Sequence, residues 1–279
     1  MIRKSFDFFL FSSLYIAGCA VLMVHQSNHL LHLHYQYIHY FAFVFFSTIC
    51  SYNFHWYLTP SAETEKIRNR WAGEHKGLHF VLFIVGLIGS AWYFFYFIEH
   101  WFWMGGAVFL TFLYSAPKIT IPPFDQLRKV AIGKTIFLAF VWMYVTTFLP
   151  IIFSEKDWQT QDTLFCISRF FLIYSICIIF DYRDRQNDRK EGIRSLITFL
   201  SERGITLLFL VCLFIFAAST VALYFTGFKP IIILFLLIPG AITMALYKFA
   251  RKNFSDYLYY FALDGLMMFS AIFTSFISI

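Results

Sequence analysis

Long apolar stretches alternate with short polar ones along the whole chain. Nine of the stretches are long enough to form helices that cross the roughly 30 Å hydrocarbon core of a bilayer. The third and fourth are separated mainly by Glu99 and His100, so we expect a tight helical hairpin there. This pattern predicts an all-α polytopic membrane protein, with nine transmembrane helices around a central cavity. The nine stretches are residues 8–24, 38–58, 78–97, 101–116, 133–153, 164–181, 204–225, 230–249 and 258–277.

Composition supports a membrane protein over a soluble one. Of the 279 residues, 59% are hydrophobic and only 14% are charged, whereas a soluble domain carries about 25% charged residues. No polar stretch is long enough for a separate soluble domain, so we expect one transmembrane domain over residues 1–279. Arg3 and Lys4 before an apolar run are typical of a signal peptide, but Asp7 interrupts the run and no small-residue cleavage site follows. We therefore interpret residues 8–24 as the first span.

The positive charges predict the orientation of the spans. If the N-terminus is cytoplasmic, all but three of the 22 Lys and Arg residues lie in cytoplasmic segments, the exceptions being Lys156, Arg169 and Lys229. An excess of Lys and Arg on the cytoplasmic side is the normal rule for membrane proteins. The net charge of +6 then reflects topology and contact with anionic lipid, and nucleic acid is not an expected partner. The expected location is a bacterial inner membrane.

Three carboxylates stand where the sixth apolar stretch ends. If the helix continues through Asp181, Asp184 and Asp188, their i, i+3, i+7 spacing places them on one face. Like charges one turn apart are unfavourable unless a cation bridges them, and oxygen ligands without His or Cys suit Mg²⁺. The alternative is a solvated helix end, in which neighbouring Arg and Lys side chains pair with the aspartates. The spacing therefore predicts a magnesium site, with salt bridging as the alternative.

The segment around these aspartates resembles a known motif. Residues 181–196 resemble the second Asp-rich motif, DxxDxxxD followed by a glycine and a basic residue, of the UbiA-type intramembrane prenyltransferases; Gly192 and Arg194 fill the last two places. The segment 114–118, Tyr-Ser-Ala-Pro-Lys, is similar to a second element of that family. The family has nine transmembrane helices, with its Asp motifs on cytoplasmic loops after the second and sixth. The resemblance therefore implies the same fold over the whole chain.

The other Asp motif of the family, NxxxDxxxD, is altered in this chain. Asn53 matches the motif at the end of the second apolar stretch, but Tyr57 and Ser61 replace the two aspartates. Asn53 could belong to the catalytic set or could hydrogen-bond within the helical bundle. Acidic residues in the following loop could substitute for the lost aspartates: Glu63, Glu65 and Glu74.

The resemblance implies transfer of a polyprenyl group from its diphosphate to an aromatic or other lipophilic acceptor, as in the synthesis of lipid quinones or pigments. Asp181, Asp184 and Asp188 would hold Mg²⁺ and, with Asn53, would form the catalytic set. Basic side chains would bind the diphosphate, and aromatic side chains would stabilise the allylic cation. The candidate basic residues are Lys118, Arg128, Lys129 and Arg185.

Two other functions remain open. The chain could be a catalytically degenerate relative that binds an isoprenoid or a partner. A transporter is the weaker alternative, for which Arg169 and Asp264, charged residues inside predicted spans, would form a relay. Our first expectation for Arg169 and Asp264 is instead a structural ion pair across the bundle.

The other metal-binding residue types do not form a recognisable site. Histidines in the segment 25–39 have helical spacing, but we interpret this segment as an interfacial loop because no carboxylate lies nearby to orient the rings. The cysteines lie inside predicted spans without CxxC spacing, so we expect neither disulfides nor zinc: Cys19, Cys50, Cys166, Cys177 and Cys212.

Overall fold

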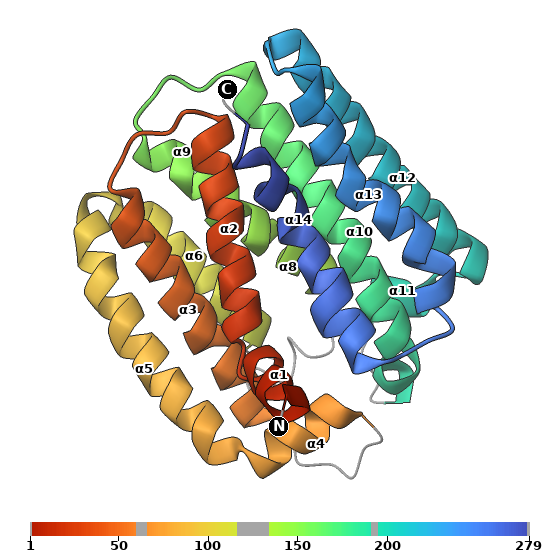
Figure 1. The fold of residues 1–279 in the computed structure, drawn as a ribbon. Coiled ribbons are helices and arrows are strands. Elements are labelled where there is room, and N and C mark those ends of the chain that lie inside the picture. The colour runs from red at the N-terminus through yellow and green to blue at the C-terminus, as the bar shows by residue number, and fades with distance from the viewer. Residues whose placement is uncertain (1, 60–65, 116–133, 191–194, 278–279) are drawn as a thin grey trace.

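The computed structural model describes residues 2–59, 66–115, 134–190 and 195–277, and every regular element in them is a helix (Figure 1). Four short helical turns adjoin the α-helices. Two are 3₁₀ turns, Phe95–His100 and Leu223–Thr226. The other two are π-helical turns, Tyr144–Phe148 and Leu258–Leu263. The α-helices are α1 Ile2–Phe11, α2 Leu14–Leu30, α3 Tyr37–Leu58, α4 Ile67–Glu74, α5 Lys76–Phe94, α6 Trp101–Ser115, α8 Lys134–Met143, α9 Leu149–Phe153, α10 Thr160–Lys190, α11 Leu196–Phe199, α12 Glu202–Ala222, α13 Pro230–Ala250 and α14 Asp264–Thr274.

The predicted apolar stretches all fall on helices, and the all-α class is confirmed for the described residues. Five helical segments are long and apolar enough to cross a membrane, and a sixth is added if the bent pair α1 and α2, which meet at 59°, counts as one span. The final helical segment, Leu258–Thr274, is apolar but short for a span. The described helices thus support a membrane protein, while the count of nine spans stays a prediction.

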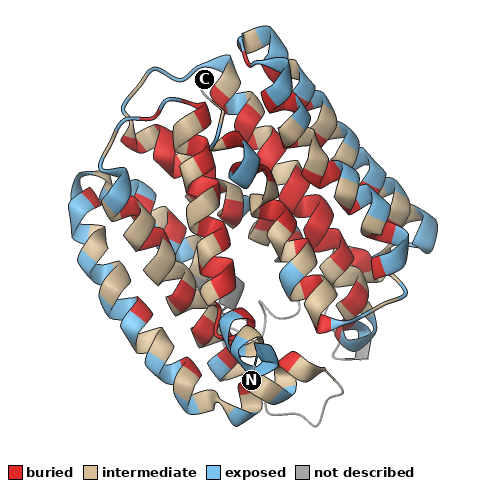
Figure 2. Cartoon of the chain, viewed as in Figure 1, coloured by how far each residue is buried: buried red, intermediate tan, exposed pale blue. Residues whose placement is uncertain are grey.

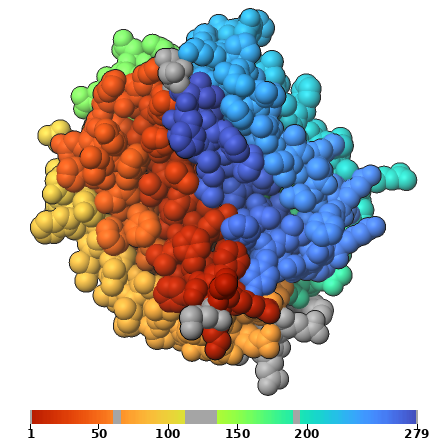
Figure 3. Space-filling view, viewed as in Figure 1, coloured from red at the N-terminus to blue at the C-terminus, as the bar shows by residue number. Residues whose placement is uncertain are grey.

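The helices form two groups that meet along the centre of the bundle. In one group α3 packs between α2 and α5; in the other α10 packs against α8 and α12. Helix α14 closes the bundle by packing against both α2 and α13, so helices from the first and last parts of the sequence lie side by side (Figure 3). Helix α10 is buried over most of its length, whereas α5 and α12 carry exposed apolar residues (Figure 2).

Helix α10 carries the Asp motif because it runs past the hydrocarbon core without a break. Its start is fixed by Asp162, whose carboxylate accepts the backbone N–H of Gln159 at 2.9 Å and pairs with Lys156 at 2.7 Å. Its 31 residues correspond to about 46 Å at the rise of an α-helix. This exceeds the roughly 30 Å of a hydrocarbon core, so the last turns of α10 can present charged residues at the end of the bundle. The same end holds α1, α4 and α11 (Figure 1).

Helices α3 and α5 approach closely because a glycine faces the contact. A Cβ atom on Gly86 would lie 2.5 Å from the backbone nitrogen of Cys50 and 2.8 Å from the carbonyl oxygen of Phe46. Backbone atoms cannot move aside as a flexible side chain can, so only glycine permits this packing. Gly105 in α6, in contrast, has no neighbouring atom within 4 Å of such a Cβ.

We expect Gly86→Ala to separate α3 from α5 and to lower the free energy of unfolding by about 1–3 kcal/mol, as overpacking of a close contact does. Gly105→Ala is the matched control and should be neutral or stabilising, because alanine favours a helix and meets no neighbour. Thermal unfolding of the purified variants in detergent measures the difference. Equal melting temperatures for the two variants would contradict the assigned close contact.

Candidate functional site

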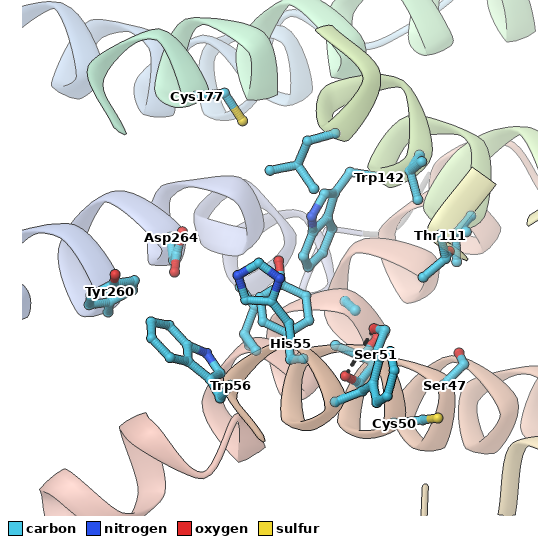
Figure 4. Close-up of a pocket in the computed structure, with 18 of the residues that line it drawn as sticks. Ser47, Cys50, Ser51, His55, Trp56, Thr111, Trp142, Cys177, Tyr260 and Asp264 are labelled. Atoms are coloured by element: carbon cyan, nitrogen blue, oxygen red, sulfur yellow. Dashed lines mark hydrogen bonds between the residues drawn. The ribbon is translucent and has the colours of Figure 1, made fainter. Parts of the chain in front are cut away.

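A cavity of about 910 Å³ lies between the two groups of helices. Its wall draws side chains from α3, α5, α6, α8, α10 and the start of α14 (Figure 4). Much of the wall is aromatic or aliphatic, and hydroxyl groups of α3, including Ser47 and Ser51, lie among the apolar residues. Trp142 and Trp56 point into this space together with His55 (Figure 4). The cavity is therefore large and mainly apolar, as sites for lipophilic ligands are.

The charged residues of the wall come from α10, from α14 and from the segment at the start of α4. Asp181, Asp184 and Asp188 all line the cavity, so the prediction that α10 continues and that they share a face is confirmed. The remaining charged residues of the wall are Lys66, Arg68, Arg183 and Asp264. Lys66 donates to Asp184 of α10, and the backbone N–H of Arg68 donates to Asp256, so the start of α4 is linked to the end of α10 and to the segment before α14. The cavity thus joins an apolar wall to a charged end.

Asp184 is at the centre of a network of ion pairs. Lys66 Nζ donates to its Oδ1 at 2.8 Å, and Arg183 Nε donates to the same oxygen at 3.1 Å. Arg183 also donates to the Tyr260 hydroxyl at 3.0 Å, and its guanidinium lies 4.4 Å from the centre of the Tyr259 ring. The carboxylate that the sequence placed in a metal site is therefore neutralised here by two cations, one of them from the segment that follows α3.

Arg68 is held differently, between aromatic rings. Its guanidinium lies 4.3 Å from the centre of the Trp56 ring and 4.2 Å from that of Tyr260, and the residue is only 4% exposed. Its backbone N–H donates to Asp256 Oδ2 at 2.9 Å, which fixes the start of α4 against the segment before α14. The side chain makes no hydrogen bond or ion pair within the described part of the chain, and its Nε is buried without a partner. A guanidinium with unused donors therefore lines the cavity.

Burial lowers the pKa of the Arg68 guanidinium, and nearby Tyr260 and Asp264 act in the opposite direction. Because the ordinary pKa of arginine lies so far above neutrality, the side chain stays charged. Faces of Trp and Tyr rings stabilise such a cation by their quadrupoles. Arg68 is therefore a positioned positive charge that can donate hydrogen bonds to an anionic ligand.

Two π-helical turns border the cavity and change which side chains reach it. The turn Tyr144–Phe148 brings Val145 and Thr146 to the wall, and the turn Leu258–Leu263 brings Tyr260. Such turns are rare and are frequent at functional sites because they shift the side chains that follow them. The periodicity of the sequence gave no sign of either turn.

Asn53 does not reach the cavity wall. It is fully buried, donates to the carbonyl oxygens of Ser12 at 3.1 Å and Ile49 at 2.8 Å, and its Oδ1 lies 2.7 Å from His79 Nδ1. These bonds join α3 to the bend before α2 and to α5. Of the two roles that the sequence left open for Asn53, the geometry favours hydrogen bonding within the bundle.

The proposed basic clamp is only partly described. Three of the four basic residues expected to bind the diphosphate lie outside the described residues: Lys118, Arg128 and Lys129. Ser61, from the altered Asp motif, lies outside them as well. Arg185 is not part of the cavity wall, because its guanidinium pairs with Glu202 and donates to the carbonyl oxygen of Leu200 at 2.7 Å. Tyr57, the other replacement in the altered motif, is exposed and is also absent from the wall. The described cations that line the same cavity as the aspartates are Lys66, Arg68 and Arg183.

The expected ion pair between Arg169 and Asp264 was wrong. Arg169 donates to Gln26 Oε1 at 3.0 Å and lies 3.4 Å from the carbonyl oxygen of Met23. Asp264 lines the cavity instead, near Tyr260 (Figure 4). The sequence placed both residues correctly inside helices but gave no information about which faces of α10 and α14 meet.

The donor atoms at the charged end suit Mg²⁺, although no finished metal site is present. Among the described residues no three His, Cys, Asp or Glu side chains are grouped so that they could hold a metal ion. Mg²⁺ is usually bound by one or two carboxylates and by the phosphates of its substrate, rather than by a complete protein cage. One or two of the α10 aspartates could therefore hold Mg²⁺ only together with the phosphate oxygens of a ligand.

Comparison of the chain with protein-family models, with curated proteins and with solved structures gives no match. The likeness to the UbiA-type prenyltransferases thus depends on the Asp motif and its place in the chain.

Sequence reasoning missed several residues that the structure places at the charged end. Lys66 and Arg68 counted only toward topology, because nothing in the sequence shows that the start of α4 reaches the end of α10. From the sequence, Arg183 was considered only as one of the basic residues that could form salt bridges with the aspartates. Its position one residue before Asp184, on a helix that carries an Asp motif, was the one signal that could have identified it.

Asn53→Ala should lower stability and leave the charged end intact, because it removes hydrogen bonds to two carbonyl oxygens and to His79. We expect a loss of about 1–3 kcal/mol in the free energy of unfolding, the usual cost of leaving buried polar groups unpaired. Thermal unfolding and pyrophosphate binding, measured on the same preparation, separate the two roles. Weaker pyrophosphate binding by a variant of unchanged stability would instead assign Asn53 to the site.

Proposed function

We propose that this protein is an integral membrane prenyltransferase that moves a polyprenyl group from its diphosphate to a lipophilic, aromatic acceptor. The observation that carries the proposal is the division of the cavity: its wall is largely apolar, while one end carries cations and carboxylates. A polyprenyl diphosphate has the same division between a long hydrocarbon chain and an anionic head. The resemblance of residues 181–196 to the prenyltransferase motif points to the same substrate.

The proposal includes a nine-helix membrane domain with the charged end of the cavity in the cytoplasm. The distribution of Lys and Arg supports this orientation. In such an arrangement the hydrocarbon chain lies within the bilayer while the diphosphate stays at the interface. The substrate then reaches the cavity without moving its charge through hydrocarbon, which would be costly.

In the proposed reaction the bond between the first prenyl carbon and the diphosphate oxygen breaks, and the electron pair leaves with the diphosphate. A ring carbon of the acceptor attacks the allylic carbon and then loses its proton. Arg68, Lys66 and Arg183 stabilise the negative charge that develops on the leaving group. Trp56, Tyr260 and the apolar wall exclude water and face the allylic cation with aromatic rings.

The negative charge of the substrate gives Mg²⁺ a role in this proposal. Among the described residues, the charged side chains of the wall are Lys66, Arg68 and Arg183 together with Asp181, Asp184, Asp188 and Asp264. A diphosphate adds further negative charge. Mg²⁺ held by Asp181, Asp184 and Asp188 would neutralise the head group and polarise the bond to the leaving oxygen.

The second candidate function is binding of an isoprenoid without catalysis. It is favoured by one observation: the segment after α3, where the family has aspartates, supplies Lys66, which is paired with Asp184. A site that lacks the aspartates of the first motif, and in which a lysine neutralises an aspartate of the second, could bind an isoprenoid without catalysing its transfer. An assay of turnover separates the two candidates.

We expect the purified protein to form a prenylated product from a labelled polyprenyl diphosphate, Mg²⁺ and an aromatic acceptor. Asp184→Asn should lower the rate by at least about 10²-fold, the scale on which groups that stabilise a leaving anion act. Asp157→Asn, at an exposed position on the opposite side of the bundle, is the control and should keep full activity. Absence of product from a panel of donors and acceptors, with retained isoprenoid binding, would favour the non-catalytic candidate.

Arg68→Gln should weaken binding of inorganic pyrophosphate by about 10- to 100-fold, the equivalent of one charge-assisted hydrogen bond. Arg68→Lys should restore only part of the affinity, because lysine lacks the planar fork of donors. Arg203→Gln, which changes an exposed cation of α12, should bind as the unaltered protein does. Titration calorimetry gives the affinities, and equal affinity of Arg68→Gln and Arg203→Gln would remove Arg68 from the site.

A further inference from the structure

A second buried charge lies away from the large cavity, in the other half of α10. Arg169 is 5% exposed and is surrounded by α2, α14 and its own helix. Its Nη2 donates to Gln26 Oε1 at 3.0 Å, and its guanidinium lies 5.2 Å from the centre of the Phe165 ring. Gln26 in turn donates to the hydroxyls of Ser270 and Thr274, at 3.1 and 3.0 Å. These partners are all neutral.

No carboxylate compensates this charge within the described part of the chain. The acidic residue closest along α10 is Asp162, two turns away, and it is paired with Lys156 at 2.7 Å. Asp264 lines the large cavity and does not pair with Arg169. A guanidinium buried in an apolar bundle without an opposite charge is costly, so a counter-ion is expected beside it.

A small void lies beside Arg169. Its volume of about 10 Å³ is close to that of one water-sized sphere. Arg169 Nη1 is buried and has no hydrogen-bond partner among the described residues. The lining of the void is mixed, with the polar residues Gln26, Ser168 and Ser270 and the apolar residues Phe165, Leu172 and Phe216.

We propose that this void binds a single halide ion, chloride under ordinary conditions. The ion would accept a hydrogen bond from Arg169 Nη1 and would neutralise the guanidinium. The Ser168 hydroxyl does not contribute a hydrogen, because Thr220 donates to the carbonyl oxygen of Phe216 at 2.7 Å and therefore accepts from Ser168 at 2.7 Å. A water molecule would satisfy Nη1 but leave the charge uncompensated, whereas a halide does both and is smaller than a carboxylate or phosphate group. The bound ion would join α10 to α2 and α14, whose residues Gln26 and Ser270 also line the void.

The test compares chloride with gluconate, an anion too large for the void, at constant ionic strength. Because a ligand that binds only the folded state stabilises it by mass action, chloride should raise the melting temperature saturably, on the order of 3 °C. Arg169→Gln should abolish this dependence on chloride. Arg203→Gln, which removes an exposed cation, should retain it. Equal melting temperatures of the unaltered protein in chloride and gluconate would overturn the proposal.

A direct measurement keeps the proposal testable if Arg169→Gln does not fold. Crystals of the unaltered protein grown in bromide should show one anomalous peak beside the Arg169 guanidinium. A peak without anomalous signal at that position would identify a water molecule and overturn the assignment. Neither measurement involves prenyl transfer, so both test the halide site independently of the function proposed above.

Discussion

The structure depends on how it accommodates positive charge inside an apolar bundle. Arg68, Arg169 and Arg183 are all nearly excluded from solvent, where an isolated charge is strongly unfavourable. Each is accommodated in its own way. Among the described residues, Arg183 has a carboxylate and aromatic rings, Arg68 has aromatic rings, and Arg169 has neutral hydrogen-bond acceptors. The three guanidinium groups therefore differ in how strongly each can still interact with a ligand.

This difference separates structural from ligand-binding cations at the charged end. Arg183 and Lys66 already bond to Asp184, so an anion that binds there must compete with that carboxylate. Arg68 has no such competitor, and Asp256 holds its backbone rather than its guanidinium. The aromatic rings fix the plane of the guanidinium without using its N–H groups. Arg68 is thus oriented in advance, which lowers the entropy lost when a ligand binds.

The helices were predictable from the sequence because their cause is local. Each apolar stretch must form a helix to satisfy its backbone in an apolar environment, and the Asp motif lies on α10 because no helix breaker precedes it. The charged end was only half predictable. The aspartates share a helix, so their spacing was informative, whereas Lys66 and Arg68 reach them through the fold of a segment more than 100 positions earlier, for which the sequence holds no periodic signal.

The wrong pairing of Arg169 with Asp264 also arose because the sequence does not show which helix faces meet. Arg169 and Asp264 each need a partner, and the simplest inference paired them, but a helix offers several faces and only packing decides which one a residue occupies. Gln26 could satisfy Arg169 because an amide presents an acceptor to the guanidinium and donors to Ser270 and Thr274 at the same time. An amide is one of the few side chains that can link a cation to two hydroxyls, yet it carries no charge. Because Gln26 is uncharged, a search for charged partners of Arg169 did not identify it. Gln26 also does not neutralise Arg169, so we expect an anion beside this guanidinium.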